Sequence, residues 1–278
     1  MRPKVCGKTM LSCERYDLAE KQIKAFTRSS IRAKIMLCLK EGPKVAVEME
    51  DIIGARVSTI LHAIKEMSDE DLVVKTTRGY ALTNIGRIQA YILDELINAI
   101  VVLDKHKEFW LTHDLSGIPV ELQMRIGVLI KGEILKGDPM AILRTQEYFT
   151  TELRNAKEIH GVSPIIVPGY AEAISIAVKN GAQVDLVLTN SILKIVLQEH
   201  RDTLRDLLLC EDFKLYRIDD DIKVAFTVTD KMLSLGLFRL DKSYDVSSDL
   251  NCIGPEPRKW GIELFAYYLS RSERICSI

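Results

Sequence analysis

Seven polar side chains between positions 56 and 78 have the clearest chemical potential in this sequence. They are Arg56, Ser58, Thr59, His62, Lys65, Lys75 and Arg78. Hydroxyl, imidazole, ammonium and guanidinium groups donate hydrogen bonds to phosphate oxygens and to the edges of nucleic-acid bases. The set is therefore suited to a polyanion, provided that the surrounding elements hold it on one surface.

Catalytic patterns are missing from the sequence. It has no G-x-S-x-G, no P-loop, no dinucleotide-type glycine repeat and no H-E-x-x-H. The histidines His106, His113, His160 and His200 lie far apart, which is typical of surface or core histidines, and the acidic run 219–221 is typical of a turn between strands. We predict no catalytic residue, no metal site and no cofactor.

The cysteines are scattered along the sequence, as is typical of free thiols in a reducing compartment. Cys6, Cys13, Cys38, Cys210, Cys252 and Cys276 form no C-x-x-C pair and lie near no histidine cluster. We expect free thiols, with a redox or metal pair of Cys6 and Cys13 as the alternative. No apolar run approaches 18 residues and no apolar block follows the basic N-terminus, so we expect a cytoplasmic protein without a membrane span.

Charge divides the chain into two parts. Residues 1–90 hold 16 Lys and Arg against 11 Asp and Glu, a balance of +5, whereas residues 91–278 hold 22 against 28, a balance of −6. At 278 residues the chain has room for two domains. The basic part is suited to a polyanion, and the acidic part to a different partner.

The sequence predicts three short helices between residues 29 and 67, and the third carries most of the polar set. In 29–42, Ser29 or Ser30 is a candidate N-cap, Gly42 is a stop signal, and the apolar face is Ile31, Ile35, Leu37, Cys38 and Leu39. A second helix ends at Gly54. The third has its apolar face at Val57, Ile60, Leu61, Ile64 and Met67, which leaves the polar residues pointing outward.

Two short β-type runs follow, "LVVKTT" and "YALT", joined at Arg78–Gly79. A hairpin this small must pack on the helices. Three helices and then a hairpin with a basic tip is the winged helix-turn-helix order, in which the third helix reads bases and the tip touches the backbone. The alternative for the third helix alone is a solvated amphipathic helix.

The segment "VSTILHAIKEMSDEDLVVKTTRGYALTNIGR" resembles the recognition helix and wing of ArsR-like winged-helix regulators. Asp71 stands where those proteins usually have Gly, and Asp tolerates a left-handed turn better than most residues. The Cys-x-Cys box of metal-sensing members is absent. The resemblance therefore implies DNA binding without metal sensing.

A longer helix begins after the hairpin. Its apolar seam runs at steps of three and four residues and consists of Ile85, Ile88, Ile92, Leu96, Ala99 and Leu103. A seam of this length directly after a winged helix predicts pairing of two protomers. Packing within one chain is the alternative.

The acidic part reads as an α/β domain preceded by mainly helical sequence from about 120 to 158. "VSPIIV", a helix stopped by Gly181, and "QVDLVLT" predict two parallel strands with a crossover. A helical stretch "NSILKIVLQEHRDTLRDLLL" follows, then strands at "FKLYRI", "KVAFTV" and "LSLGLFRL", and a closing helix near "RKWGIELFAYYLSRSERI".

The phrases "FWLTHDLSGIP", "KEIHGVSPI", "LVLTNS", "VAFTVTDKMLSLGLF" and "WGIELFAYY" resemble, in that order, the C-terminal domain of winged-helix regulators of methanogenic archaea that control methanogenesis and filament formation. That domain is similar to a phospholipase D-like half. The His-x-Lys of the hydrolases is absent here, so the resemblance implies a sensor. Two departures are Lys242, where Gly is expected in a turn, and Val167, where His is frequent.

We expect an effector, small and polar or anionic, at the carboxyl ends of the two parallel strands. The loops there supply Gly169, Tyr170, Thr189, Asn190 and Ser191. Capping of the following helices is the alternative role for the last three.

The sequence thus predicts an N-terminal extension (1–28), a winged helix-turn-helix (29–87), a linker and dimerisation helix (83–107) and an α/β, phospholipase D-like C-terminal domain (108–278). The expected function is a homodimeric, sequence-specific transcriptional regulator of a double-stranded DNA operator, responding to a small-molecule effector or a protein partner. A degenerate phospholipase D-like hydrolase and a protein-interaction module are the alternatives.

Overall fold

The computed structural model of this chain describes residues 12–136, 147, 149–219 and 221–278. The chain forms two compact units, Met1–Ile97 (unit 1) and Asn98–Ile278 (unit 2). Within the described residues, none of the helices combines the length and the apolar character needed to cross a membrane. Cys6 lies outside the described residues, and the described cysteines are free thiols.

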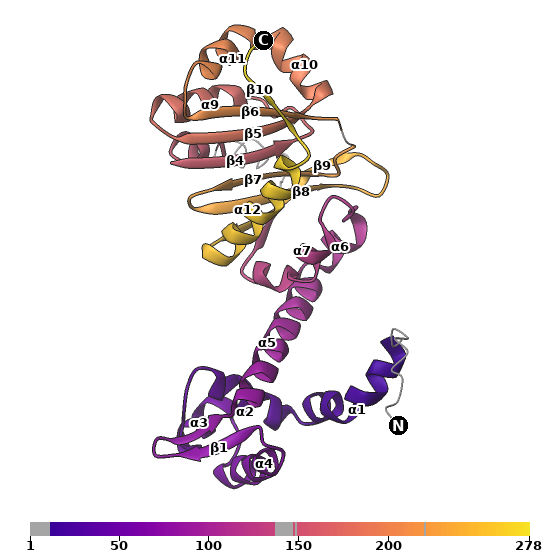
Figure 1. The fold of residues 1–278 in the computed structure, drawn as a ribbon, viewed down its shortest axis with the longest axis vertical. Helices are drawn as coiled ribbons and strands as arrows, with labels where there is room; N and C mark the ends of the chain where they lie inside the picture. The colour runs from indigo at the N-terminus through magenta and orange to yellow at the C-terminus, as the bar shows by residue number, and fades with distance from the viewer. Residues whose placement is uncertain (1–11, 137–146, 148, 220) are drawn as a thin grey trace, which may run out of the picture. The chain divides into compact units, whose positions relative to one another are not determined.

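Unit 1 consists of helices and one hairpin (Figure 1). Its elements are α1 (Ser12–Arg28), α2 (Ser30–Lys40), α3 (Ala46–Ile53), α4 (Val57–Asp69), β1 (Val73–Thr76), β2 (Gly79–Leu82) and the first part of α5 (Asn84–Lys105). The expected order of three helices and a hairpin is observed in α2 to β2. The Ser29 side chain caps α2 by accepting from the Arg32 backbone N–H, and Gly54 ends α3 in the left-handed region.

The core of unit 1 is formed by the inward faces of α2, α3, α4 and the hairpin. Its fully buried side chains include Ile35, Met36, Met49, Ile60 and Met67. Leu61 was expected in this core but is 40% exposed. Each helical step turns the side chain by about 100°, so a residue directly after the buried Ile60 leaves the buried stripe.

The hairpin turn differs by one residue from the sequence prediction. Thr76 pairs with Gly79, so the two turn residues are Thr77 and Arg78 rather than Arg78 and Gly79. Gly79 has φ +110°, and a Cβ there would lie 2.4 Å from the Lys44 carbonyl oxygen. Only glycine allows this close approach, which pairs Lys44 with Tyr80 and fixes the hairpin on the helices.

Unit 2 is built on an eight-stranded mixed sheet with the order β10-β6-β5-β4-β7-β8-β9-β3 (Figure 1). Its strands are β3 (Glu133–Lys136), β4 (Glu158–Ser163), β5 (Gln183–Thr189), β6 (Phe213–Ile218), β7 (Val224–Thr229), β8 (Met232–Phe238), β9 (Tyr244–Ile253) and β10 (Glu273–Ile275). Its helices are the end of α5, α6 (Lys107–Thr112), α7 (Val120–Gln123), the 3-10 turn η1 (Ile126–Leu129), α9 (Tyr170–Lys179), α10 (Asn190–Glu199), α11 (Arg201–Leu208) and α12 (Pro255–Leu269).

The expected parallel pair is present, because β4 and β5 are parallel, and β6 extends it in parallel. The first strand lies earlier than predicted, at 158–163 rather than 162–167. Pro164 explains the shift, since it cannot donate to a strand ladder. The predicted helical stretch 190–209 is two helices that meet at His200. The sequence prediction also missed β3, β9 and β10.

Helix α12 packs against β4, β7, β8 and β9 and against η1. Trp260 and Leu264 of this helix are fully buried in a core that includes Leu233, Leu235 and Leu250 of β8 and β9. A second core lies beneath α9, α10 and α11. The residues between these α12-facing side chains in the middle of β7, β8 and β9 lie on the other face of the sheet, and they are small or polar: Ala225, Thr227, Ser234, Gly236, Asp249 and Asn251.

Candidate functional site

The seven polar residues of the sequence prediction are all exposed in unit 1. Arg56 is the N-cap residue of α4, and Ser58, Thr59, His62 and Lys65 follow on this helix. The remaining two, Lys75 on β1 and Arg78 in the turn, belong to the hairpin. The structure therefore holds the set on the outer side of one helix and on the adjoining hairpin.

The side chain of Arg56, at the start of α4, is not used to cap the helix. The Glu50 carboxylate accepts a hydrogen bond from the Val57 backbone N–H at 3.1 Å, and the Arg56 side chain makes no capping hydrogen bond. His62 Nδ1 lies 3.5 Å from the Glu66 carboxylate. Within the part of the chain that the structure describes, no ion pair involves Arg56, Lys65, Lys75 or Arg78. These four charges are available to an anion.

The seam predicted on α5 is largely exposed. Ile85, Ile88, Ile92 and Leu96 have 57, 62, 65 and 53% of their surface accessible, and Leu103 has 44%. Ala99 differs, because it packs against the core of unit 2. The opposite side of the helix is buried through residues such as Leu93 and Val102.

Unit 2 contains a cavity of about 330 Å³ on the sheet face that α12 leaves uncovered. The following described residues line it: Phe149, Val162, Ser163, Ile165, Ile166, Val167, Pro168, Tyr170, Ala225, Phe226, Thr227, Ser234, Gly236, Tyr244, Val246, Ser247, Ser248, Asp249 and Asn251. Small side chains on β7 and β8, such as Ala225 and Gly236, leave the space that the cavity occupies. Its volume is at the lower end of the range typical of ligand pockets, about 300–1,000 Å³.

Two tyrosines and one carboxylate dominate the chemistry of the cavity. The Tyr244 hydroxyl donates to Asp249 Oδ1 at 3.2 Å, and the Tyr170 hydroxyl shares a hydrogen bond with Thr227 Oγ1 at 2.6 Å. Burial raises the pKa of Asp249 to about 6 and that of Tyr170 to about 12. The ring of Tyr170 stacks on Phe149 with centroids 5.9 Å apart.

The hydrogen-bonded side chains of Tyr244 and Asp249 lie directly over Gly236. A Cβ at that position would lie 2.1 Å from the Tyr244 hydroxyl oxygen and 2.5 Å from Asp249 Oδ1. No side chain fits there, so glycine is required for Asp249 and Tyr244 to meet over the sheet.

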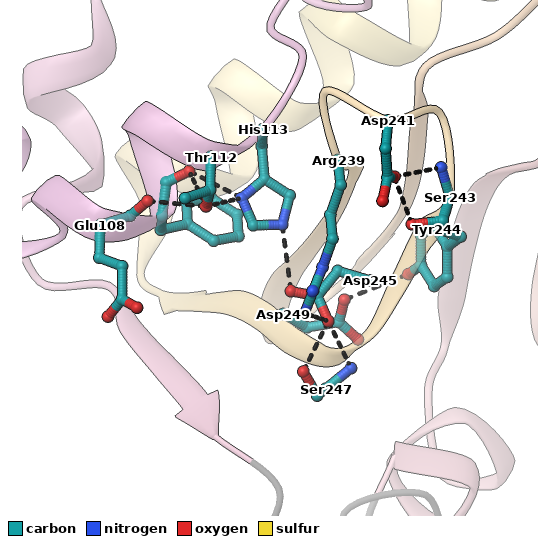
Figure 2. Close-up of polar contacts among 11 residues, drawn as sticks. Glu108, Thr112, His113, Arg239, Asp241, Ser243, Tyr244, Asp245, Ser247 and Asp249 are labelled. Atoms are coloured by element: carbon teal, nitrogen blue, oxygen red, sulfur yellow. Dashed lines mark hydrogen bonds and ion pairs between the residues drawn. The ribbon is translucent and has the colours of Figure 1, made fainter.

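A second carboxylate on β9 is held by a hydrogen-bonded network (Figure 2). Asp245 Oδ2 lies 3.2 Å from His113 Nε2, and its Oδ1 lies 3.1 Å from the Arg239 guanidinium. The Ser247 hydroxyl and backbone N–H donate to Oδ1 at 2.6 and 3.0 Å. Burial alone would raise the pKa of Asp245, but the donors from Ser247 and Arg239 lower it to about 2.

The predicted effector residues fall into two groups. Tyr170 lines the cavity, and Gly169 before it adopts φ +78°. Thr189, Asn190 and Ser191 do not line it. The Thr189 hydroxyl instead caps α10 by accepting from the Ile192 backbone N–H at 3.4 Å, which is the capping role weighed for these residues.

Comparison with known families was made for both units. Residues 20–101 match the family model for "Methanogenesis regulatory protein FilR1, N-terminal domain", and residues 142–271 match that for the middle domain. A curated FilR1 from Methanothrix harundinacea (strain 6Ac) is 34% identical over 259 residues. The chain is a homologue of FilR1. The match covers 92% of this chain, which spans 58% of the length of that FilR1.

Solved structures give weaker likenesses. TrmBL2, described as an archaeal chromatin protein with a novel mode of DNA binding, is 15% identical, with 95% of this chain and all of that chain covered and a TM-score of 0.42. Nuc, a phospholipase D family member from Salmonella typhimurium, is 14% identical over 52% of this chain and 99% of its own, with a TM-score of 0.37. These TM-scores are too low to carry a functional inference for a FilR1 homologue.

The FilR1 matches bear out the expected kinship with a methanogenesis regulator, and the ArsR-like part of that expectation stays a prediction. Sequence reasoning missed the cavity within the FilR1 middle-domain match. A signal existed in the middle of β7, β8 and β9, where small or polar residues stand on both sides of an apolar one in "AFT", "SLG" and "DLN". This alternation marks a strand face with room above it.

Proposed function

We propose that this chain is a cytoplasmic transcription regulator that binds a double-stranded DNA operator through a winged helix formed by α2, α3, α4 and the β1–β2 hairpin. The observation that carries the proposal is the exposed polar side of α4 beside a hairpin whose turn holds Arg78. Homology to a methanogenesis regulatory protein supports a regulatory role.

The roles of the seven residues follow from their chemistry. Ser58, Thr59 and His62 carry short donors and acceptors that reach base edges when a helix enters the major groove. Arg56, Lys65, Lys75 and Arg78 supply positive charge to phosphates on either side. The helices beneath hold these groups in place, because the opposite side of α4 is buried at Ile60, Ile64 and Met67.

Selection of genomic fragments by the purified protein, followed by titration at several salt concentrations, tests the proposal. Arg78→Ala should weaken all duplexes about equally and reduce the slope of log K against log salt concentration by about 1, because one phosphate contact is lost. Thr59→Ala and His62→Ala should instead change the preference between sequences.

Lys179→Ala is the matched control, since Lys179 is an exposed cation at the end of α9 in unit 2. It should leave both affinity and salt slope unchanged. If the Arg78, Thr59 and His62 variants all bound the selected duplex as tightly as the wild type, α4 and the hairpin would not be the DNA-reading surface.

The exposed apolar side of α5 supports a homodimer. A stripe formed by Ile85, Ile88, Ile92 and Leu96 is costly to leave in water, and a second copy of the same helix would cover it. Two-fold pairing would also present two copies of α4 to a two-part operator.

Two alternative functions, a hydrolase and a protein-interaction module, would require other features of the chain. A phospholipase D-like hydrolase would need the His-x-Lys motif, which the sequence lacks. A protein-interaction module would use the same surface of α4 without a preference for nucleic acid. Binding that is lost with rising salt and that depends on duplex sequence favours the DNA-binding proposal over both alternatives.

A further inference from the structure

The cavity of unit 2 presents one ionisable carboxylate to a mainly apolar space. Asp249 borders it together with the rings of Phe149 and Tyr170 and with the aliphatic residues Ile165, Ile166 and Val167 of the loop after β4. Among the described residues that line the cavity there is no Lys, Arg or His. An anionic ligand would therefore meet a carboxylate and no counter-charge.

The environment of Asp249 leaves half of its carboxylate available. Its Oδ1 accepts the hydrogen bond from Tyr244, and no hydrogen bond to Oδ2 is found within the described residues. Burial raises the pKa of Asp249 to about 6, with the nearby charge of Asp245 acting in the same direction. At neutral pH the group is thus an ionised carboxylate without a positive partner, which is an unfavourable state in a partly dry site.

The aromatic part of the cavity complements this charge. The stacked Phe149 and Tyr170 rings provide flat apolar surface, and aromatic faces attract cations through their quadrupole. A ligand that carries one positive group and a small hydrocarbon body would satisfy Asp249 and bury apolar surface at the same time.

We propose that this cavity binds a small organic ammonium ion, with Asp249 as its counter-ion and with Phe149, Tyr170 and the aliphatic wall around its hydrocarbon part. The site shares Tyr170 and the loop after β4 with the predicted effector site, but it extends over β7, β8 and β9 and not to the loop after β5. Its proposed ligand is a cation, whereas the sequence predicts a polar or anionic effector. This proposal does not depend on DNA binding by unit 1, because binding of a ligand to the cavity can be measured without DNA.

The strongest competing ligand class is an anion. The observation in favour of an anion is the N-terminus of α9 at Tyr170. The backbone N–H groups in the first turn of a helix point out of its N-terminal end and favour a negative charge there. A test must therefore compare ligands that have similar shapes and different charges. Benzylamine, benzyl alcohol and benzoate share one ring and differ in charge, and n-butylamine tests whether the ring itself is needed.

Ligand-observed NMR on the full chain measures binding of these four probes directly. Benzylamine should bind the wild type, benzyl alcohol should bind more weakly, and benzoate should not compete. Asp249→Asn should weaken benzylamine by at least about tenfold, the loss expected for one charge-assisted contact, and should leave benzyl alcohol nearly unchanged. Asp202→Asn, at an exposed position on α11, is the control and should bind as the wild type does.

A second variant keeps the test decisive if Asp249→Asn alters folding. Val167→Trp places a bulky ring in the cavity from the loop after β4 and should abolish binding of every probe while the far-UV circular dichroism stays native. Equal binding of benzyl alcohol and benzylamine, preferred binding of benzoate, or failure of both amines to bind the folded wild type would each overturn the proposal. None of these results bears on operator binding.

Discussion

Two aspartates on one strand have opposite acidities because their neighbours differ. Asp245 receives hydrogen bonds from Ser247 and an ion pair from Arg239, and its pKa falls to about 2. Asp249, four residues later, accepts from the Tyr244 hydroxyl alone among the described residues, and burial raises its pKa to about 6. Asp245 therefore stabilises the fold in its ionised form, and Asp249 does not.

Asp249→Asn should stabilise the protein above about pH 6. The folded-state pKa is raised from 3.8 to about 6, so the contribution of Asp249 to stability is lost as pH rises through this interval. The shift corresponds to at most about 3 kcal/mol, and Asn keeps the acceptor for Tyr244. Urea denaturation at several pH values measures the difference, which should vanish below about pH 4. A variant no more stable than the wild type at neutral pH would show that Asp249 carries no such penalty.

Lys242→Gly should stabilise the β8–β9 turn. Lys242 has φ +72°, a left-handed conformation that costs a residue with a Cβ about 1 kcal/mol and costs glycine little. The turn is otherwise well formed, since the Arg239 backbone N–H donates to the Ser243 carbonyl at 2.7 Å. Thermal unfolding should show a higher midpoint.

Lys214→Gly is the matched control for that substitution, because Lys214 lies within β6 and has no positive φ. There glycine should lower stability by about 1 kcal/mol. If Lys242→Gly and Lys214→Gly changed the stability in the same direction, the loss of the Lys side chain, and not the backbone conformation, would determine the effect.

At the scale of elements, a half-buried histidine joins the centre of the sheet to α12. His160 on β4 has Nε2 at 2.8 Å from the Glu158 carboxylate and Nδ1 at 3.4 Å from that of Asp185 on β5, and its ring lies 5.0 Å from that of Phe265 on α12. Glu158 is also ion-paired with Arg258 of α12. Burial disfavours the charged ring, but the two carboxylates outweigh it and raise the pKa of His160.

This arrangement predicts a pH dependence of stability. Because the folded-state pKa of His160 is raised, its contribution is fully present below about pH 6.5 and is lost as pH rises through the folded-state pKa. His160→Gln should remove this step, so that the difference in unfolding free energy between wild type and variant shrinks with rising pH. His62→Gln, at an exposed position on α4, should leave the step in place. A constant difference between wild type and His160→Gln from about pH 5 to 9 would contradict the prediction.

At the scale of the whole molecule, the exposed seam of α5 is the surface proposed to pair two protomers. Replacing Ile92 and Leu96 together with Asp should give a monomer in sedimentation velocity, because two charges would enter the centre of the pairing surface. Far-UV circular dichroism should stay nearly unchanged, since both side chains are exposed and the buried side of the helix is intact. Operator affinity should fall as well, because each monomer holds one α4.

Arg87→Glu is the control for charge alone, since Arg87 is exposed on the same helix and the helical period directs it away from the seam. It should remain dimeric. A wild type that sediments as a monomer at micromolar concentration would remove the pairing role from α5 and leave its apolar side unexplained.

The local pattern of the sequence determined unit 1. Caps, glycine stops and apolar spacing predicted α2, α3, α4 and the hairpin, because each is fixed by residues close together in the chain. Asp71, which stands where glycine is expected, has the left-handed φ of +58°, and in unit 2 Lys242 likewise has φ +72°. The outward direction of the polar residues on α4 followed from the helical period alone.

Only the tertiary structure revealed the cavity of unit 2. It is formed by a loop after β4 and by strands β7, β8 and β9, and long-range pairing brings these segments together. The polar strand β9 escaped prediction because its alternate residues lack the apolar signal of a core strand. Asp249 becomes a candidate counter-ion only when its burial in this cavity beside Tyr244 is known, and neither its burial nor that contact can be predicted from the neighbouring residues in the sequence.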